Sequence, residues 1–123
     1  MYYLKGDGSW NAHQVYRMFN NQLSSTRTLS VYLRQHTAVW AQLATSTAFT
    51  VFANFNLSNG TLGTRGGGAS SSAITPAPNG WYRCEMTFNT FDAKSFICYI
   101  VDGSNSIRGE FNYQTGGIYI SSS

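Results

Sequence analysis

The chain has 123 residues, of which 42% are hydrophobic and only 11% charged, and its net charge is +3. This length allows one hydrophobic core, so we expect a single domain over residues 1–123. The apolar and aromatic content excludes a disordered chain, and no stretch approaches the 18 apolar residues of a membrane-spanning helix.

The basic residues are spread along the chain: Lys5, Arg17, Arg27, Arg34, Arg65, Arg83, Lys94 and Arg108. Proteins that bind nucleic acids usually cluster such charges on one face, so no nucleic-acid partner is expected. The N-terminus lacks the apolar segment of a signal peptide. We therefore expect a protein that folds in the cytosol, without insertion into a membrane.

Seven segments rich in β-branched and aromatic residues follow one another at short intervals. They are residues 13–19, 28–34, 39–43, 49–57, 81–88, 95–101 and 117–121. Turn-forming residues separate them, and this spacing is typical of an all-β sandwich or barrel. For the first segment, a short helix near residues 11–20 is the alternative to a strand. The glycine- and serine-rich stretch from Gly63 to Ser72 is expected to be a flexible loop within the domain.

Alternation along the strands predicts which side chains face the core. In residues 28–34, Leu29, Val31 and Leu33 share one face. In residues 81–88, the apolar set is Tyr82, Cys84, Met86 and Phe88, and the opposite face carries Trp81, Arg83, Glu85 and Thr87. Residues 95–101 are apolar on both faces, which indicates a strand that is covered on both sides.

The two cysteines, Cys84 and Cys98, lie in segments separated by only six residues. We expect these segments to form a hairpin, with both cysteines on the core face of adjacent strands. A disulfide would require close Cα atoms. Two buried free thiols that pack as small hydrophobic side chains are the favoured interpretation, and the bridge stays open as the alternative.

No combination of residues indicates catalysis. There are five acidic residues and two histidines, without the spacing of a zinc site. Glu85 faces outward beside Arg83, and Cys84 points into the core, where reactive thiols are not expected. The glycine-rich stretch lacks the lysine of a phosphate-binding loop. We expect no catalytic residue, no metal and no cofactor.

Aromatic side chains are more numerous than a core of this size requires. Tyr and Trp combine an apolar ring with a polar group, which suits them to glycan-binding surfaces and to subunit interfaces. Packing within the protein is the alternative for each of them. The candidate ligand-binding residues are Trp81, Arg83, Tyr32, Arg34 and Trp40.

Four blocks of sequence resemble a known family when taken in order. They are TLSVYLR (28–34), FANFNLSNGTLGT (52–64), ITPAPNGWYRCEMTF (74–88) and GGIYIS (116–121). Together they resemble a β-sandwich domain of tailed-bacteriophage virion proteins, including tail fibres and minor tail proteins. The architecture of that domain is similar to carbohydrate-binding modules and concanavalin-like jelly rolls. The resemblance implies an antiparallel, jelly-roll-like β-sandwich and a structural or adhesive role without enzymatic activity.

The expected function is that of a bacteriophage virion structural or accessory protein. The expected role is a capsid decoration, head-fibre or tail component, and the length fits the first two better than a tail fibre. The expected location is the virion, after assembly in the host cytoplasm. Expected partners are other virion proteins, further copies of the chain and a cell-surface glycan. The alternative is a stand-alone carbohydrate-binding module related to phage tail-fibre or depolymerase domains. A less favoured reading is an enzyme, such as a lyase or esterase, on the same sandwich.

Overall fold

The structure is a computed structural model that describes residues 2–5, 13–18, 26–45, 50–89, 95–107 and 116–122. The described residues form ten strands and one short 3-10 turn, η1 (Pro78–Gly80). The strands are β1 (Tyr2–Lys5), β2 (His13–Met18), β3 (Thr26–Gln35), β4 (Trp40–Thr45), β5 (Phe52–Asn56), β6 (Thr61–Arg65), β7 (Ala69–Pro76), β8 (Trp81–Asn89), β9 (Ser95–Val101) and β10 (Gly117–Ser122).

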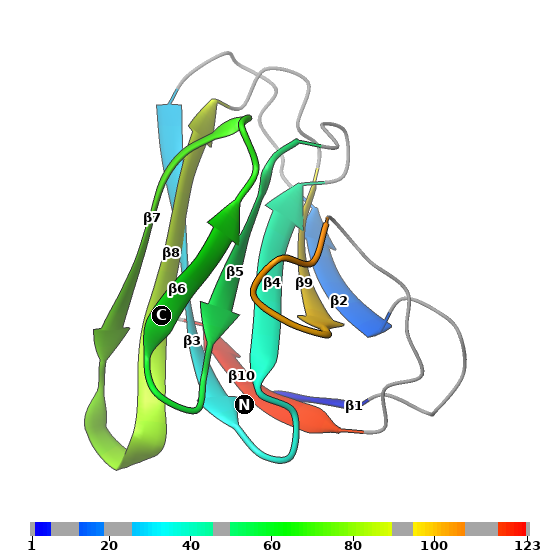
Figure 1. Ribbon diagram of the computed structural model, residues 1–123, viewed down its shortest axis with the longest axis vertical. Coiled ribbons are helices and arrows are strands. Elements are labelled where there is room, and N and C mark those ends of the chain that lie inside the picture. The colour runs from blue at the N-terminus through cyan, green and yellow to red at the C-terminus, as the bar shows by residue number, and fades with distance from the viewer. Residues whose placement is uncertain are drawn as a thin grey trace.

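The strands form two antiparallel sheets that face one another (Figure 1). Sheet I has the strand order β1-β10-β3-β8-β7, and sheet II has the order β2-β9-β4-β5-β6. The structure therefore confirms the predicted all-β sandwich.

The strand pairing follows the nested pattern of a jelly roll. Strand β1 pairs with β10, β2 with β9, β3 with β8, and β4 with β5. Each of the first four strands thus pairs with a strand that follows later in the chain, and the outermost pairs are the most distant in sequence. Strands β6 and β7 extend this arrangement by adding one edge strand to each sheet. The jelly-roll-like topology is confirmed.

The pleat of the central strands sorts their side chains as the alternation predicts. On β3, Val31 and Leu33 are buried in the main core, and Leu29 packs against it. On β8, Cys84, Met86 and Phe88 are buried in the same core, and Tyr82 is partly buried against it. The opposite faces of both strands are free to carry polar and aromatic residues.

Sheet II is also covered on its outer face. Cys98 and Ile100 of β9 belong to the main core, while three residues of the opposite phase form a second buried cluster with residues of β4 and β5. The members of this cluster are Ala44, Phe52, Ile97, Tyr99 and Val101, with Trp40 packed against them. The prediction that this strand is covered on both sides is confirmed for residues 97–101, whose burial the structure describes.

The predicted hairpin between residues 81–88 and 95–101 is wrong. Strand β8 lies in sheet I beside β3 and β7, whereas β9 lies in sheet II between β2 and β4. An apolar face is buried equally well beside a neighbouring strand or across the core, so alternation alone does not distinguish the two arrangements. Cys84 and Cys98 consequently enter the same core from opposite sheets, and both are free thiols.

The expected flexible loop from Gly63 to Ser72 is also wrong, because most of it is β6 and β7. Both are edge strands, which expose much of their surface and do not need a continuous apolar pattern. Between them, the backbone N–H of Gly66 donates to the Phe52 carbonyl at 2.9 Å. A side chain at Gly66 would collide with the Thr50 carbonyl oxygen, which explains the glycine.

The N-terminal part contributes two strands. Residues 13–18 form β2, in antiparallel register with β9, so the strand prediction there is confirmed and the alternative helix is wrong for these residues. Strand β1 was not predicted. It has only four residues, and its main-chain pairing with β10 places it at the edge of sheet I.

Candidate binding surface on sheet I

The outer face of sheet I carries a group of aromatic and charged side chains, here named the aromatic face. These side chains lie on β1, β3, β8 and β10, where they alternate with core residues, or directly after β3. All of them are partly or fully exposed. The aromatic face comprises Tyr3, Tyr32, Arg34, His36, Trp81, Arg83, Glu85 and Tyr119.

One row of this face crosses four strands in direct register. Tyr3 of β1 lies opposite Tyr119 of β10, Tyr119 opposite Arg34 of β3, and Arg34 opposite Trp81 of β8. The ring centroids of Tyr3 and Tyr119 are 5.0 Å apart. The Arg34 guanidinium carbon lies 5.9 Å from the Tyr119 ring centroid, within the range of a cation–π contact. The row is thus built by cross-strand neighbours, and the side chains of Tyr3, Tyr119 and Arg34 are in contact.

The next row lies two residues further along the same strands. Ser121 of β10 is opposite Tyr32 of β3, which is opposite Arg83 of β8. Arg83 pairs with Glu85 on its own strand, at 3.8 Å between Nη2 and Oε2. Both side chains are partly exposed, so this pair contributes little to stability, but it neutralises the charge of Arg83 on the aromatic face.

The β1 end of the face is closed by His36. The Tyr3 hydroxyl and His36 Nδ1 are 3.2 Å apart and share a hydrogen bond. The imidazole meets the rings of Tyr3 and Tyr119 edge-on, with centroid distances of 5.4 Å in both cases. These three rings therefore support one another, which favours a fixed orientation.

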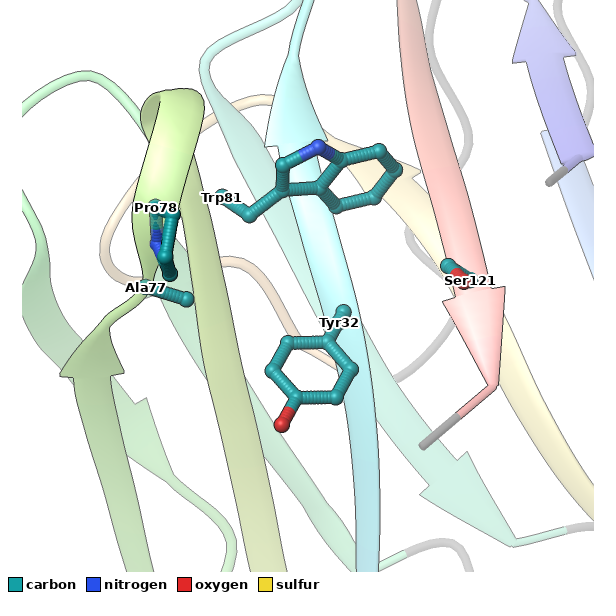
Figure 2. Close-up of a pocket in the computed structure, with 5 residues that line it drawn as sticks. All are labelled: Tyr32, Ala77, Pro78, Trp81 and Ser121. Carbon is teal, nitrogen blue, oxygen red and sulfur yellow. The ribbon is translucent and has the colours of Figure 1, made fainter.

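An open depression of about 310 Å³ lies at the β8 end of the face. It is lined by Tyr32, Ala77, Pro78, Trp81 and Ser121, and Figure 2 shows the indole and phenol rings on the same side of the sheet. Trp81 and Tyr32 are diagonal neighbours on adjacent strands, since Tyr32 is opposite Arg83. The depression offers two rings to a ligand at once.

A tight turn positions Trp81 at the rim. Asn79 and Gly80 adopt positive φ angles of 63° and 81°, which asparagine and glycine accept most readily. The Trp81 backbone N–H donates to the Pro78 carbonyl, and the Ala77 N–H donates to the Trp81 carbonyl at 2.8 Å. The Asn79-Gly80 turn thus fixes the start of β8.

Three polar groups on the face have no partner among the described residues. They are the indole N–H of Trp81, the hydroxyl of Tyr32 and the guanidinium N–H groups of Arg34, whose recorded contact is the Tyr119 ring. Unpaired donors beside exposed rings are available to hydrogen-bond a ligand.

Four of the five candidate binding residues meet on this face, and Trp40 does not. Trp40 begins β4 in sheet II and packs against the second apolar cluster. Its ring lies over Gly63 of β6, where an added Cβ would stand 2.8 Å from Trp40 Cζ3. Trp40 therefore serves packing in sheet II and is distant in the topology from the aromatic face.

The outer face of sheet II is occupied by the chain itself. The buried amides of Gln42 and Asn54 donate hydrogen bonds to backbone carbonyls of residues 104–107. This segment follows β9 and lies across β4 and β5. The aromatic face of sheet I, by contrast, carries an open depression among the described residues.

The cysteines do not contribute to the surface. Burial raises the pKa of the Cys98 thiol to about 12. Burial also raises the pKa of Cys84, with smaller contributions from Cys98 and Glu85. Both groups are therefore protonated at neutral pH, and a protonated, buried thiol is a poor nucleophile.

No protein-family model matches the chain, and no curated protein matches it at a significant level. Among the described residues, no group of three or more His, Cys, Asp or Glu side chains is placed to hold a metal ion. The described segments include no helix with the length and apolar character to cross a membrane.

Tyr3, His36 and Tyr119 are residues of the face that the candidate set lacked. For Tyr119 a signal was present, because it alternates with Ile118 and Ile120 and so points away from the core. Tyr3 gave no such signal, since β1 is short and its partner strand is about 115 residues away in the sequence.

Proposed function

We propose that the chain is a non-enzymatic structural or accessory protein of a bacteriophage virion, which binds carbohydrate through its aromatic face. The observation that carries the binding role is the depression between Trp81 and Tyr32, two residues whose side-chain polar groups have no hydrogen-bond partner among the described residues. Pyranose rings present apolar patches flanked by hydroxyl groups. Half-buried aromatic rings with nearby hydrogen-bond donors match that pattern.

The virion role is supported by the four sequence blocks and by where they lie. TLSVYLR falls on β3, the NGWYRC part of ITPAPNGWYRCEMTF leads into β8, and GGIYIS falls on β10, and these three strands are consecutive in sheet I. These strands carry most of the aromatic face. A surface protein of a particle would present this face outward, while its other surfaces contact virion proteins or further copies of the chain.

Glycan binding is tested with a glycan array and with titrations of any hit. The variants are Trp81→Ala and Tyr32→Ala, and the control is Leu62→Ala, an exposed apolar residue on β6 of sheet II. We expect each aromatic variant to weaken binding about tenfold or more, and the control to leave it unchanged. Equal binding by all four proteins would place the site elsewhere, and an array without hits would refute the binding role.

The virion role is tested on purified particles of the phage that encodes the chain. An antibody raised against the protein, visualised by electron microscopy, is expected to label the capsid or tail at many positions. Particles without label would refute the virion role. Glycan binding without label on particles would instead favour the alternative, a stand-alone carbohydrate-binding module.

A further inference from the structure

Arg34 is a cation at the centre of the aromatic face, and no carboxylate of the described residues pairs with it. It stands between Tyr119 and Trp81 in the four-strand row and is exposed. Its recorded contact is the Tyr119 ring. The neighbouring Arg83, by contrast, is paired with Glu85 at 3.8 Å. Among the side chains of the face that the structure describes, Arg34 is therefore an arginine without a compensating carboxylate.

We propose that the aromatic face recognises an acidic polysaccharide, with Arg34 binding the carboxylate of a uronic acid residue whose ring rests on Trp81. This inference rests on the proposed carbohydrate-binding function and narrows its ligand to one chemical class.

The spacing of the two residues fits such a ligand. Arg34 and Trp81 are direct cross-strand partners, and such partners have Cβ atoms about 4.5–5.5 Å apart. A uronic acid carries its carboxylate directly on the sugar ring, so ring and carboxylate are separated by a single bond. A ring over the indole brings its carboxylate within reach of the guanidinium, whose planar N–H groups pair with both oxygens.

The length of the row favours a polymer over a single sugar. Tyr3, Tyr119, Arg34 and Trp81 occupy four neighbouring strands, and three inter-strand steps of ~4.8 Å give a row of ~14 Å. The Tyr3 and Tyr119 rings extend the contact surface beyond Arg34. Several consecutive sugars are needed to cover it.

The test compares polyuronates with their carboxyl-reduced forms. The probes are oligomers of polygalacturonate, alginate and hyaluronan, each before and after reduction of the carboxylates to alcohols, together with dextran sulfate. The proteins are wild type, Arg34→Gln, Arg34→Lys and Arg65→Gln. Arg65 is an exposed arginine on β6 of sheet II, so its substitution changes the net charge equally without touching the aromatic face.

We expect wild type to bind at least one polyuronate about tenfold more tightly than its reduced form, at physiological salt. Arg34→Gln is expected to abolish that difference while its thermal unfolding stays unchanged. Arg34→Lys is expected to restore part of the difference, because it keeps the charge but loses the fork geometry. Arg65→Gln is expected to bind as wild type does.

Three outcomes would overturn the inference. Equal loss of affinity in Arg34→Gln and Arg65→Gln would indicate attraction by net charge. Tighter binding of dextran sulfate than of every polyuronate would indicate a different anion. Binding of neutral glycans that depends on Trp81 but not on Arg34 would overturn the acidic ligand and leave the proposed function in place, whereas absence of all glycan binding would refute both.

Discussion

The side chain of Gln42 donates a hydrogen bond to Asn54 across β4 and β5, at 2.9 Å between Nε2 and Oδ1. Both side chains are fully buried, with exposed fractions of 0% and 1%. They are direct cross-strand partners on the outer face of sheet II. Their remaining N–H groups bond to the carbonyls of Ser104, Ser106 and Ile107. This pair joins the segment after β9 to the sheet.

Asn54→Ala is expected to lower the free energy of unfolding by about 1–3 kcal/mol, because it removes the buried hydrogen bond from Gln42 and the two hydrogen bonds to the carbonyls of Ser104 and Ser106. Chemical denaturation measures the change. The control is Asn105→Ala, which removes an exposed hydrogen bond with Thr64 in the same segment and is expected to cost under about 0.5 kcal/mol. Equal effects of the two substitutions would contradict the structural role of the buried pair.

Gly63→Ala is expected to destabilise the protein by about 1–3 kcal/mol through overpacking. The new methyl group would stand 2.8 Å from Trp40 Cζ3 and 2.9 Å from the Ser104 carbonyl oxygen. Gly67→Ala is the matched control, because nothing lies within 4 Å of a Cβ at that position. Thermal unfolding of both variants decides the matter: a Gly63→Ala protein as stable as the control would show that Trp40 does not lie over β6.

The buried thiols are expected to make stability fall at alkaline pH. The folded pKa of Cys98 is about 12, that of Cys84 is also raised, and an unfolded thiol has a pKa of about 8.5. Below about pH 8.5 the thiols are protonated in both states, so their contribution is fully present. At higher pH the unfolded chain releases protons that the native protein keeps, and the free energy of unfolding decreases.

Urea unfolding at pH 7.5 and 9.5 tests this linkage. The wild type is expected to lose about 2–3 kcal/mol more between these pH values than the double variant Cys84→Ala, Cys98→Ala, since each thiol contributes up to ~1.4 kcal/mol per pH unit. Native wild-type protein is also expected to resist thiol reagents until it unfolds. The same pH dependence in both proteins, or rapid labelling of the native state, would contradict the burial of the thiols.

Two neighbouring residues of β3 are expected to respond very differently to truncation. Leu33 is fully buried in the main core, whereas Arg34 is exposed on the aromatic face. Leu33→Ala is expected to cost about 2–5 kcal/mol of stability, and Arg34→Ala under about 0.5 kcal/mol. Denaturant titrations measure the free energy of unfolding of both variants. A large cost at Arg34 would mean that the aromatic face is built for stability rather than for binding.

The sequence by itself indicated seven of the ten described strands and the direction of alternating side chains on β3 and β8. Two-residue alternation is a local property, so it sorted Val31 from Tyr32 and Cys84 from Arg83 without knowledge of the fold. It also indicated that β9 is covered on both faces. Alternation also predicts that four of the five candidate residues point away from the core, and the structure shows that their two strands are neighbours.

Only the tertiary structure decided which strands are neighbours. Pairing joins residues far apart in the chain, as in β1 with β10, and an apolar face does not specify its partner. This is why the β8–β9 hairpin was mispredicted and why Tyr3 was absent from the candidate set. The local sequence also did not predict the edge strands β6 and β7 or the burial of Gln42, because both depend on neighbouring segments of the fold. A polar residue such as Gln42 can be exposed to solvent or buried with a hydrogen-bond partner. Only the packing of the folded chain decides which of these two states it adopts.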